Sequence, residues 1–330
     1  MKPTDSQIFI KGVREQNRRM LSKTITLIES SLPDHQQLAR KIVDQLLPHT
    51  EKAVRLGITG VPGVGKSTFI ESLGISLVEA GRRVAVLAVD PSSSRSGGSV
   101  MADKTRMEKL SVQENAFIRP SPSRGTLGGV ARKTRETMLV CEAAEFDVII
   151  VETVGVGQSE TTVASMVDFF LVLMLSGAGD ELQGIKRGVL ELADAIAITK
   201  ADSDNIEKAK KAAKIYKTAL HMLQPTSPNW DPPVLTCSAL EMIGIVEIWQ
   251  MVIKYHKKFE ASGELEQKRQ KQALDWLWSL IEEGLRERFD TNPEIKKQLR
   301  RIARAVEKGE TSPTLAADEL LFFLDNNPSV

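Results

Sequence analysis

GVPGVGKS, at residues 60–67, is a complete G-x-x-x-x-G-K-S phosphate-binding loop. It directly follows the apolar run 54–59 and directly precedes a helical pattern from Thr68 to Ala80, the strand–loop–helix context that the motif requires. Its glycines let backbone N–H groups converge on phosphate oxygens, and the helix N-terminus adds a partial positive charge. The stretch therefore predicts a nucleoside triphosphate site within an α/β fold.

Two side chains of this loop carry charge chemistry. Lys66 is expected to reach the β- and γ-phosphates, and the Ser67 hydroxyl to ligate Mg²⁺. Lys66 is accordingly one of two residues that we predict to take part in catalysis, the other being Glu152, which is discussed below.

Composition narrows the classes of partner. The 330 residues carry 44 Lys and Arg against 43 Asp and Glu, so no overall field recruits nucleic acid or an anionic membrane. No apolar stretch approaches the length of a membrane span, and the first twenty residues lack the apolar core of a secretory signal. The two cysteines are far apart in sequence and suit a reducing compartment. These features predict a cytoplasmic protein without nucleic-acid or membrane partners.

The hydrophobic pattern divides the chain into three parts. Residues 1–48 predict an N-terminal extension of two helices, 49–260 a nucleotide-binding domain, and 261–330 a helical arm. In the middle part, short apolar runs separated by helical segments predict a doubly wound, mostly parallel, seven-stranded sheet buried on both faces. The expected strands are Val54–Thr59, Val84–Val89, Ala116–Ile118, Val148–Val151, Phe169–Leu175, Ala195–Thr199 and Val234–Thr236.

The C-terminal arm is helical throughout, with further helices expected around 295–306 and from 312 to 323. Two interpretations stay open: the arm packs on its own domain, or it buries an apolar stripe against a second copy of the chain. We favour the homodimer, because three helices bearing Trp, Phe and Leu exceed what the nucleotide-binding fold needs. The stripe recurs at spacings of three and four, at Leu274, Leu277, Trp278, Ile281 and Leu285.

The base is expected to be read beyond the sixth strand, where residues 199–202 read TKAD. A carboxylate at Asp202 accepts hydrogen bonds from the guanine ring N–H and its exocyclic amine, and adenine would leave it unpaired. The Lys200 stem can lie over the purine, and residues 238–240, SAL, resemble the loop that meets the guanine carbonyl. Thr199 stands where guanine-specific proteins carry Asn, which leaves open whether that side chain's bridge to the phosphate loop is kept. The residues predicted to bind GTP are Gly60, Val61, Pro62, Gly63, Val64, Gly65, Lys66, Ser67, Thr68, Lys200, Asp202, Ser238, Ala239 and Leu240.

Three carboxylates fall at strand ends or loops on the edge that carries the phosphate loop. Mg²⁺ takes oxygen ligands and keeps several waters. We therefore predict that Asp90, Asp103 and Glu152 hold the ion with Ser67, directly or through water. The sequence does not identify the residue that orients the attacking water; Gln158 is one candidate.

Longer motifs point to a family. Glu152 opens ETVG at 152–155, where most GTPases have Asp-x-x-Gly, and so resembles the GTPase class with glutamate in its third motif. Within that class VDPSS at 89–93, DKTRM at 103–107 and ETVGVGQSE at 152–160 resemble the branch called MeaB or ArgK. The resemblance covers nearly the whole chain, and Ala102 departs from the Gly that is common in the family.

This resemblance implies an accessory GTPase of adenosylcobalamin-dependent methylmalonyl-CoA mutase, a chaperone that protects the mutase and gates its cofactor loading. It also implies that residues 177–186 face the mutase. We expect weak intrinsic GTP hydrolysis that rises when the partner completes the site. The client is left open between this mutase and a related one, such as isobutyryl-CoA mutase. An alternative is a kinase acting on an amino-acid transport binding protein, an older label for the branch.

Overall fold

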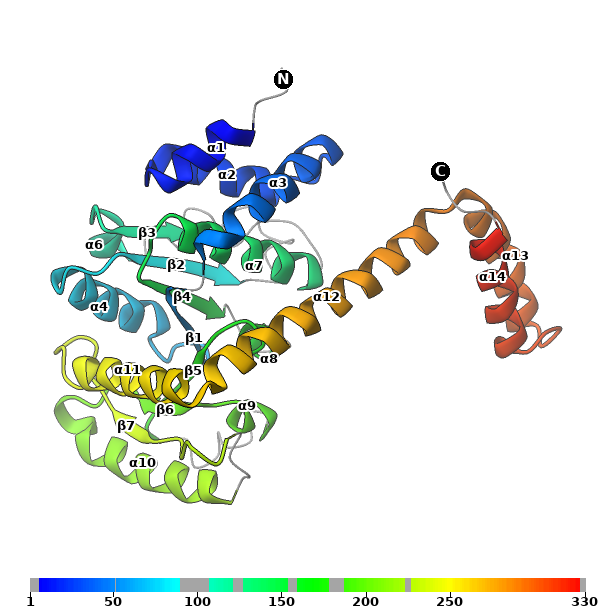
Figure 1. Cartoon of the computed structure of the whole chain (residues 1–330). Helices are drawn as coiled ribbons and strands as arrows, with labels where there is room; N and C mark the ends of the chain where they lie inside the picture. Colours follow the sequence, from blue (N-terminus) through cyan, green and yellow to red (C-terminus); the bar gives the residue numbers. More distant parts are fainter. Residues whose placement is uncertain are drawn as a thin grey trace. The chain divides into compact units, whose positions relative to one another are not determined.

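The computed structural model describes residues 6–50, 52–89, 107–120, 127–153, 159–177, 187–222 and 227–326 (Figure 1). The chain forms two compact units, Met1–Arg269 and Gln270–Val330. The division lies within the long helix α12 (Glu264–Thr291), a few residues beyond the boundary at 261 that the sequence pattern suggests.

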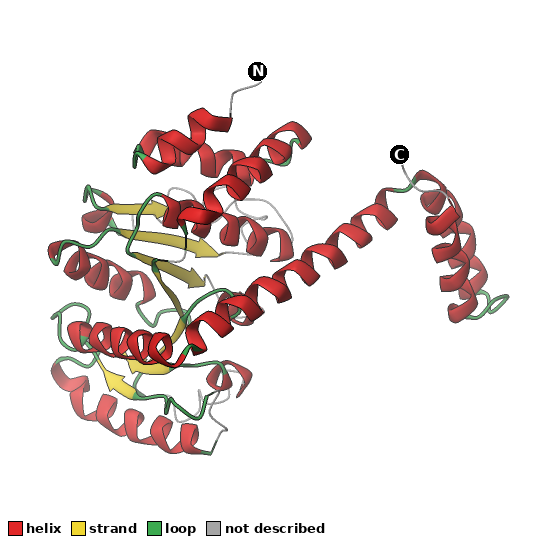
Figure 2. Ribbon diagram, viewed as in Figure 1, coloured by secondary structure: helices red, strands yellow, loops and turns green. Residues whose placement is uncertain are grey.

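The larger unit is built on a sheet of seven parallel strands, as predicted (Figure 2). The strand order is β3-β2-β4-β1-β5-β6-β7, so β1 lies at the centre. Strands β2 to β4 lie on one side of β1 and strands β5 to β7 on the other, so the order in which the chain adds strands to the sheet reverses at β1. Observed and predicted strands agree to within two residues at each end. The strands are β1 (Val54–Gly60), β2 (Val84–Val89), β3 (Ala116–Arg119), β4 (Val148–Thr153), β5 (Phe169–Met174), β6 (Ala195–Ile198) and β7 (Val234–Thr236).

Helices cover both faces of the sheet, which is why its central strands are almost continuously apolar. Successive residues of β5 alternate between two cores: Phe170 and Val172 join one, and Phe169 and Leu171 join the other. The first core is completed mainly by α1 (Ser6–Arg14), α2 (Arg18–Glu29), α3 (Pro33–Leu46), α7 (Leu127–Ala143), α8 (Ser159–Ala164) and α10 (Ile206–His221). The second is completed mainly by α4 (Lys66–Glu79), α6 (Glu108–Ser111) and α11 (Ile245–Ser262).

The N-terminal extension contains three α-helices within residues 6–50, where the sequence pattern suggested two. The additional helix, α1, buries Phe9 and Val13. It is separated from α2 by Gln16 in a left-handed conformation (φ +59°) and by Asn17, whose side chain accepts hydrogen bonds from two N–H groups of α2. Helix α1 has only nine residues, fewer than the window of 11–18 over which helical periodicity is read, and this explains the omission.

Aspartates precede two of the strands and accept hydrogen bonds from the backbone of the neighbouring strand. Asp168 precedes β5 and accepts from the N–H of Arg55 at 2.9 Å. Asp194 precedes β6 and accepts from the N–H of Phe170 at 2.9 Å. These carboxylates therefore fix strand register at the edge of the sheet opposite the phosphate loop.

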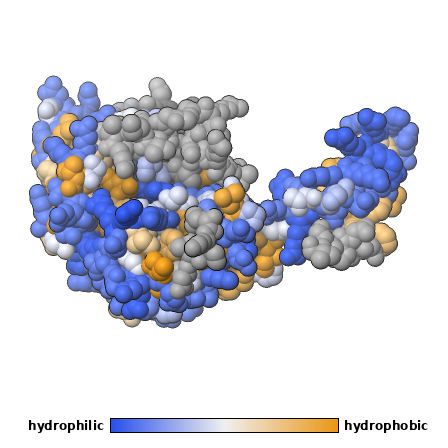
Figure 3. Space-filling view, turned by 90° about the horizontal axis from the view of Figure 1, so that it is seen from above, coloured by the Kyte–Doolittle hydropathy of each residue, from blue (hydrophilic) through white to orange (hydrophobic). Residues whose placement is uncertain are grey.

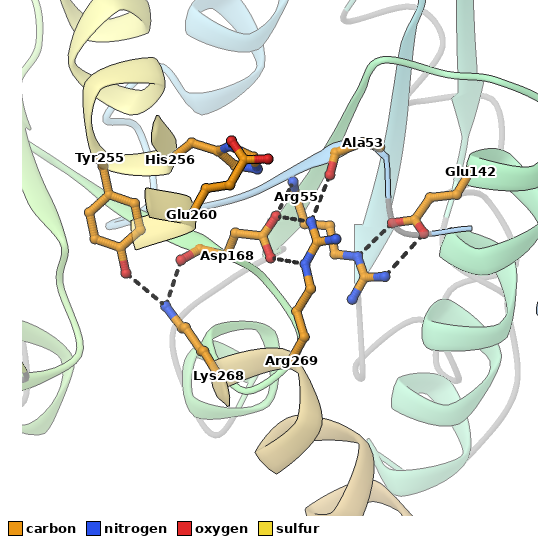
Figure 4. A network of polar contacts seen from close by, with 9 residues as sticks. All are labelled: Ala53, Arg55, Glu142, Asp168, Tyr255, His256, Glu260, Lys268 and Arg269. Atoms are coloured by element: carbon orange, nitrogen blue, oxygen red, sulfur yellow. Dashed lines mark hydrogen bonds and ion pairs between the residues drawn. The ribbon is translucent and has the colours of Figure 1, made fainter. Parts of the chain in front are cut away.

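Basic side chains pair with the buried carboxylates here: arginines with Asp168 and Glu142 (Figure 4), and Lys268 with Asp194 at 3.5 Å. Arg269, from the start of α12, donates Nε to Asp168 Oδ1 at 2.8 Å and Nη2 to Oδ2 at 2.6 Å. Its Nη2 also donates to the Ala53 carbonyl at 2.8 Å. Arg55 makes a matching two-pronged contact with buried Glu142 of α7, at 2.6 and 3.0 Å. The network thus ties the first helical turns of α12 to strands β1 and β5.

Burial and charge act on Asp168 in opposite directions. Desolvation alone would raise the pKa of its carboxyl, but the hydrogen bonds and positive charge of Arg269, together with the charge of Arg55, lower that pKa below its ordinary value. The folded protein therefore holds this group ionised.

The smaller unit is helical and has a small buried core. Helices α13 (Pro293–Glu307) and α14 (Pro313–Asn326) pack against each other, and Arg301 of α13 pairs with Glu319 of α14 at 2.6 Å. Proline opens both helices, as the sequence indicates for α14. Among its described residues the buried apolar core consists of Ile295, Ile302, Ala316 and Leu320.

The surface of the larger unit is mainly hydrophilic in the view of Figure 3, with apolar residues in small separate groups. Within the described residues, no helix combines the length and apolar character that crossing a membrane requires.

We predict that Arg269→Met lowers the free energy of unfolding by about 3–5 kcal/mol, because it leaves the buried Asp168 carboxylate without its bidentate partner. The pKa of Asp168 is depressed in the folded protein, so the ion pair's contribution is present above the pKa of an unfolded aspartate. It is lost as the pH falls through the depressed folded pKa. Denaturant titrations followed by circular dichroism should therefore show the gap between variant and wild type narrowing below about pH 4.

The matched control is Lys210→Met, which breaks an exposed pair with Glu207 and should leave the free energy of unfolding close to that of the wild type. Equal losses in the two variants would refute a structural role for the Asp168–Arg269 pair.

Candidate nucleotide-binding site

The phosphate loop joins the carboxyl end of central strand β1 to the first turn of α4, which begins at Lys66. The Lys66 ammonium donates to the Gly60 carbonyl at 2.8 Å and to the Val61 carbonyl at 3.4 Å, so its side chain arches over its own loop. Ser67 and Thr68 follow in the same helical turn, with their backbone N–H groups at the helix N-terminus. This is a geometry suited to phosphate.

Two glycines of the loop are required by its shape. A Cβ on Gly60 would lie 2.5 Å from the Leu173 carbonyl oxygen, so only glycine allows β1 and β5 to approach here. Gly65 has φ +93°, a left-handed conformation, at the point where the chain turns into α4. The buried Val64 side chain anchors the loop between them.

Strand β4 brings Glu152 to the same edge. Glu152 is in register with Ile58 of β1, and Thr153 exchanges a 2.7 Å hydrogen bond with Thr59 one residue further along. The Ser67 hydroxyl donates to Glu152 Oε1 at 3.4 Å, although the two residues are 85 positions apart. The glutamate is 6% exposed, so its carboxylate is held beside the loop rather than in solvent.

Ser67 and Glu152 together offer the oxygen donors that Mg²⁺ takes in nucleotide sites, so the residues present fit this ion. The other two predicted metal ligands, Asp90 and Asp103, lie outside the described residues, as do Val154–Gln158 and residues 178–186. Within the part of the chain that the structure describes, no group of three or more His, Cys, Asp or Glu side chains is assembled for a metal.

The predicted base-reading residues meet at the carboxyl ends of β6 and β7. The hydroxyl of buried Ser238 donates to Asp202 Oδ2 at 2.5 Å, and the Ala201 N–H donates to the Cys237 carbonyl at 3.0 Å. The Ser238 bond orients the carboxylate and leaves further acceptor positions on it for a base. Lys200 is exposed and has φ +56°.

Thr199, which stands where guanine-specific proteins carry Asn, still bridges to the phosphate loop. Its buried hydroxyl donates to the Val64 carbonyl of the phosphate loop at 2.7 Å and lies 3.2 Å from the Met174 carbonyl. The threonine therefore keeps the bridge between base loop and phosphate loop, with a shorter side chain. The bridge was not predictable from the substitution alone, because it depends on how closely β6 approaches Val64.

A second link, which no sequence motif indicated, joins α4 to the loop after β7. The Ser72 hydroxyl donates to the Ala239 carbonyl at 2.8 Å. Leu240, which follows Ala239 and is predicted to contact the nucleotide, has a side chain that is 81% exposed. The loop is closed by paired hydrogen bonds between Ser238 and Ile243, so its position is set by the fold.

Comparison with known proteins identifies what the chain is similar to. A family model described as "Methylmalonyl Co-A mutase-associated GTPase MeaB" matches residues 21–294. A "Putative GTPase" of Caulobacter vibrioides is 55% identical over 305 residues, covering 92% of this chain and 93% of that protein. "GTPase ArgK" of Escherichia coli K12 is 47% identical over 315 residues, covering 96% and 95%. A crystal structure described as "LAO/AO transport system kinase" has a TM-score of 0.79 and 42% identity, covering 97% of both chains.

We predict that Thr199→Val, which keeps the side chain's shape but removes its donor, weakens GDP binding and lowers the free energy of unfolding by about 1–3 kcal/mol. The reason is that the Val64 carbonyl loses a buried partner. Thr199→Ser retains the hydroxyl and is the control. Calorimetric titration with GDP, paired with thermal unfolding, measures both effects; a Val variant indistinguishable from the Ser variant would argue against the bridge.

Proposed function

The chain belongs to the MeaB family of methylmalonyl-CoA mutase-associated GTPases, and on this premise we propose that it is a GTP-driven chaperone of an adenosylcobalamin-dependent mutase. In this proposal it binds methylmalonyl-CoA mutase or a related enzyme, protects it, and gates the loading of its cofactor. The support for the client is the description of the family. The support for a nucleotide-driven cycle is the joined phosphate and base loops, above all the bond from Thr199 to Val64.

In the proposed site each side chain has a separate task. Lys66 neutralises the phosphate charge that grows during hydrolysis, and Ser67 and Glu152 hold Mg²⁺, which supplies further charge neutralisation when it is bound. Asp202 accepts from the guanine ring N–H and amine, while the Lys200 stem covers the purine face. Ser238, Ala239 and Leu240 border the guanine carbonyl. The remaining proposed contacts to GTP are the loop residues 60–65 and Thr68.

The kinase alternative is supported by the description of a related crystal structure. We give it second place, because the site's contacts are accounted for by nucleotide binding and hydrolysis. The proposed location is the cytoplasm, with which the two buried free thiols, Cys141 and Cys237, are compatible.

The client is tested with purified full-length protein and purified methylmalonyl-CoA mutase. We predict that the mutase raises the rate of GTP hydrolysis at least about tenfold, because one positioned charge or donor from a partner is worth that much or more in phosphoryl transfer. Phosphate release from GTP, with and without mutase, is the measurement. A Lys66→Ala variant should remain inactive in both conditions.

The same assay, repeated with isobutyryl-CoA mutase and with γ-labelled GTP, distinguishes the two possible clients and the kinase alternative. Stimulation by isobutyryl-CoA mutase alone would reassign the client, while label transfer from γ-labelled GTP to protein would favour the kinase. Equal turnover with and without either mutase would count against a partner-completed site.

We further propose that the chain forms a homodimer through its C-terminal arm. Five apolar side chains of α12 form a stripe, and each is at least 40% exposed in the single chain. The smaller unit, with its few buried residues, also has less core than an independent domain of its length requires. A second copy would cover these surfaces. The stripe consists of Leu274, Leu277, Trp278, Ile281 and Leu285.

We predict that the double variant Leu277→Glu and Trp278→Glu is monomeric, because two charges in a buried stripe cannot be solvated. Ser279→Glu adds one such charge at an exposed position away from the stripe and should leave the dimer intact. Analytical ultracentrifugation of the full chain measures the outcome. A wild-type monomer at micromolar concentration, or an unchanged mass in the double variant, would exclude this interface.

A further inference from the structure

Asn205 occupies the position just before α10, where asparagine commonly caps a helix, yet its side chain makes no capping hydrogen bond. It has a helical backbone conformation, with φ −93° and ψ −8°, instead of the extended one that capping residues adopt. The chain thus forgoes a common source of helix stability at this position, which raises the question of what else the amide does.

The amide of Asn205 joins two loops of the nucleotide site. Its Nδ2 donates to the Lys200 carbonyl at 2.6 Å. Its Oδ1 accepts from the Ser176 hydroxyl, also at 2.6 Å. Ser176 follows β5, and Lys200 follows β6, so the one side chain connects the carboxyl ends of neighbouring strands.

The bond to Lys200 acts on a strained backbone. Lys200 has φ +56°, in the left-handed region that is unfavourable for a residue with a Cβ. In this conformation the Lys200 carbonyl points to the Asn205 amide, and the chain then continues to Asp202. Without the bond, Lys200 would be free to relax, and the two residues that face the base would lose their fixed positions.

We propose that Asn205 is a positioning residue for guanine recognition, which locks Lys200 in its left-handed conformation and fastens the base-reading loop to Ser176. It acts through Lys200 and does not itself contact the nucleotide. The inference rests on the proposed role of Lys200 at the base. The preference of the wild type for GDP over ADP tests that role separately.

The test uses full-length Asn205→Ala, Asn205→Asp, Ser176→Ala and Ser176→Thr. We expect Asn205→Ala to raise the Kd for GDP about fivefold, the usual effect of one lost hydrogen bond. Asn205→Asp should raise it at least as much, because a carboxylate keeps the acceptor for Ser176 but cannot donate to Lys200. The kcat at saturating GTP should stay within about twofold, since the phosphate loop is untouched, so the change falls on KM.

The Ser176 variants test the second half of the bridge. Ser176→Ala should raise the Kd for GDP about twofold, and Ser176→Thr, which keeps the hydroxyl, should restore wild-type binding. Combined with Asn205→Ala, Ser176→Ala should add no further loss, because both act through the same contact.

A structural control separates positioning from general stability. Asn17 caps α2 by accepting hydrogen bonds from the N–H groups of Arg19 and Met20. Helix α2 lies at the β3 end of the sheet, whereas Asn205 precedes α10 at the β7 end (Figure 1). Asn17→Ala should lower the thermal midpoint without changing the Kd for GDP. The proposal is overturned if Asn205→Ala or Asn205→Asp binds GDP within twofold of wild type, or if Asn17→Ala weakens binding as much.

Discussion

Parallel strand direction is the constraint on which this molecule depends. The carboxyl ends of all seven strands of the sheet lie on the same side, so the loops that follow them, although distant in the sequence, come close together there. Lys66 follows β1, Glu152 is the penultimate residue of β4, and Asp202 follows β6. The hydroxyl of Thr199 then closes the arrangement, because it ties the base loop to the carbonyl of Val64 in the phosphate loop. A nucleotide held by both loops is thereby held by one connected structure.

The amino and carboxyl ends of the strands have different roles. At the amino ends of the strands, buried Asp168 fixes strand register and pairs with Arg269, which belongs to the helix that leads into the smaller unit. At the carboxyl edge, loops with left-handed residues such as Gly65 and Lys200 carry the proposed nucleotide contacts. The proposed nucleotide contacts thus include a strained backbone at Lys200, whereas the buried pair of Asp168 and Arg269 maintains the fold.

Much of this architecture follows from the sequence, since buried parallel strands give continuous apolar runs and the phosphate loop marks the end of the central one. The family likewise follows from motifs with Glu152 at their centre, and the comparisons confirm it. What the sequence could not supply are contacts set by the spacing of elements: the Thr199 bridge, the Ser72 bond to Ala239, and the amide of Asn205. Helix α1 was missed because it is short. The proposed roles of Asp90 and Asp103 are still predictions, as both lie outside the described residues.

Calorimetric titration of the wild type and of Asp202→Asn with GDP, ADP and xanthosine diphosphate tests the central claim, that one carboxylate selects the base, most directly. The wild type should prefer GDP to ADP by a large factor, up to roughly 10⁴–10⁵, because adenine leaves the carboxylate unpaired. The asparagine variant should lose GDP and gain xanthosine diphosphate, since its amide can donate to the 2-oxo group that replaces the amine. Equal affinity of the wild type for ADP and GDP, or an unchanged preference in the variant, would contradict the account.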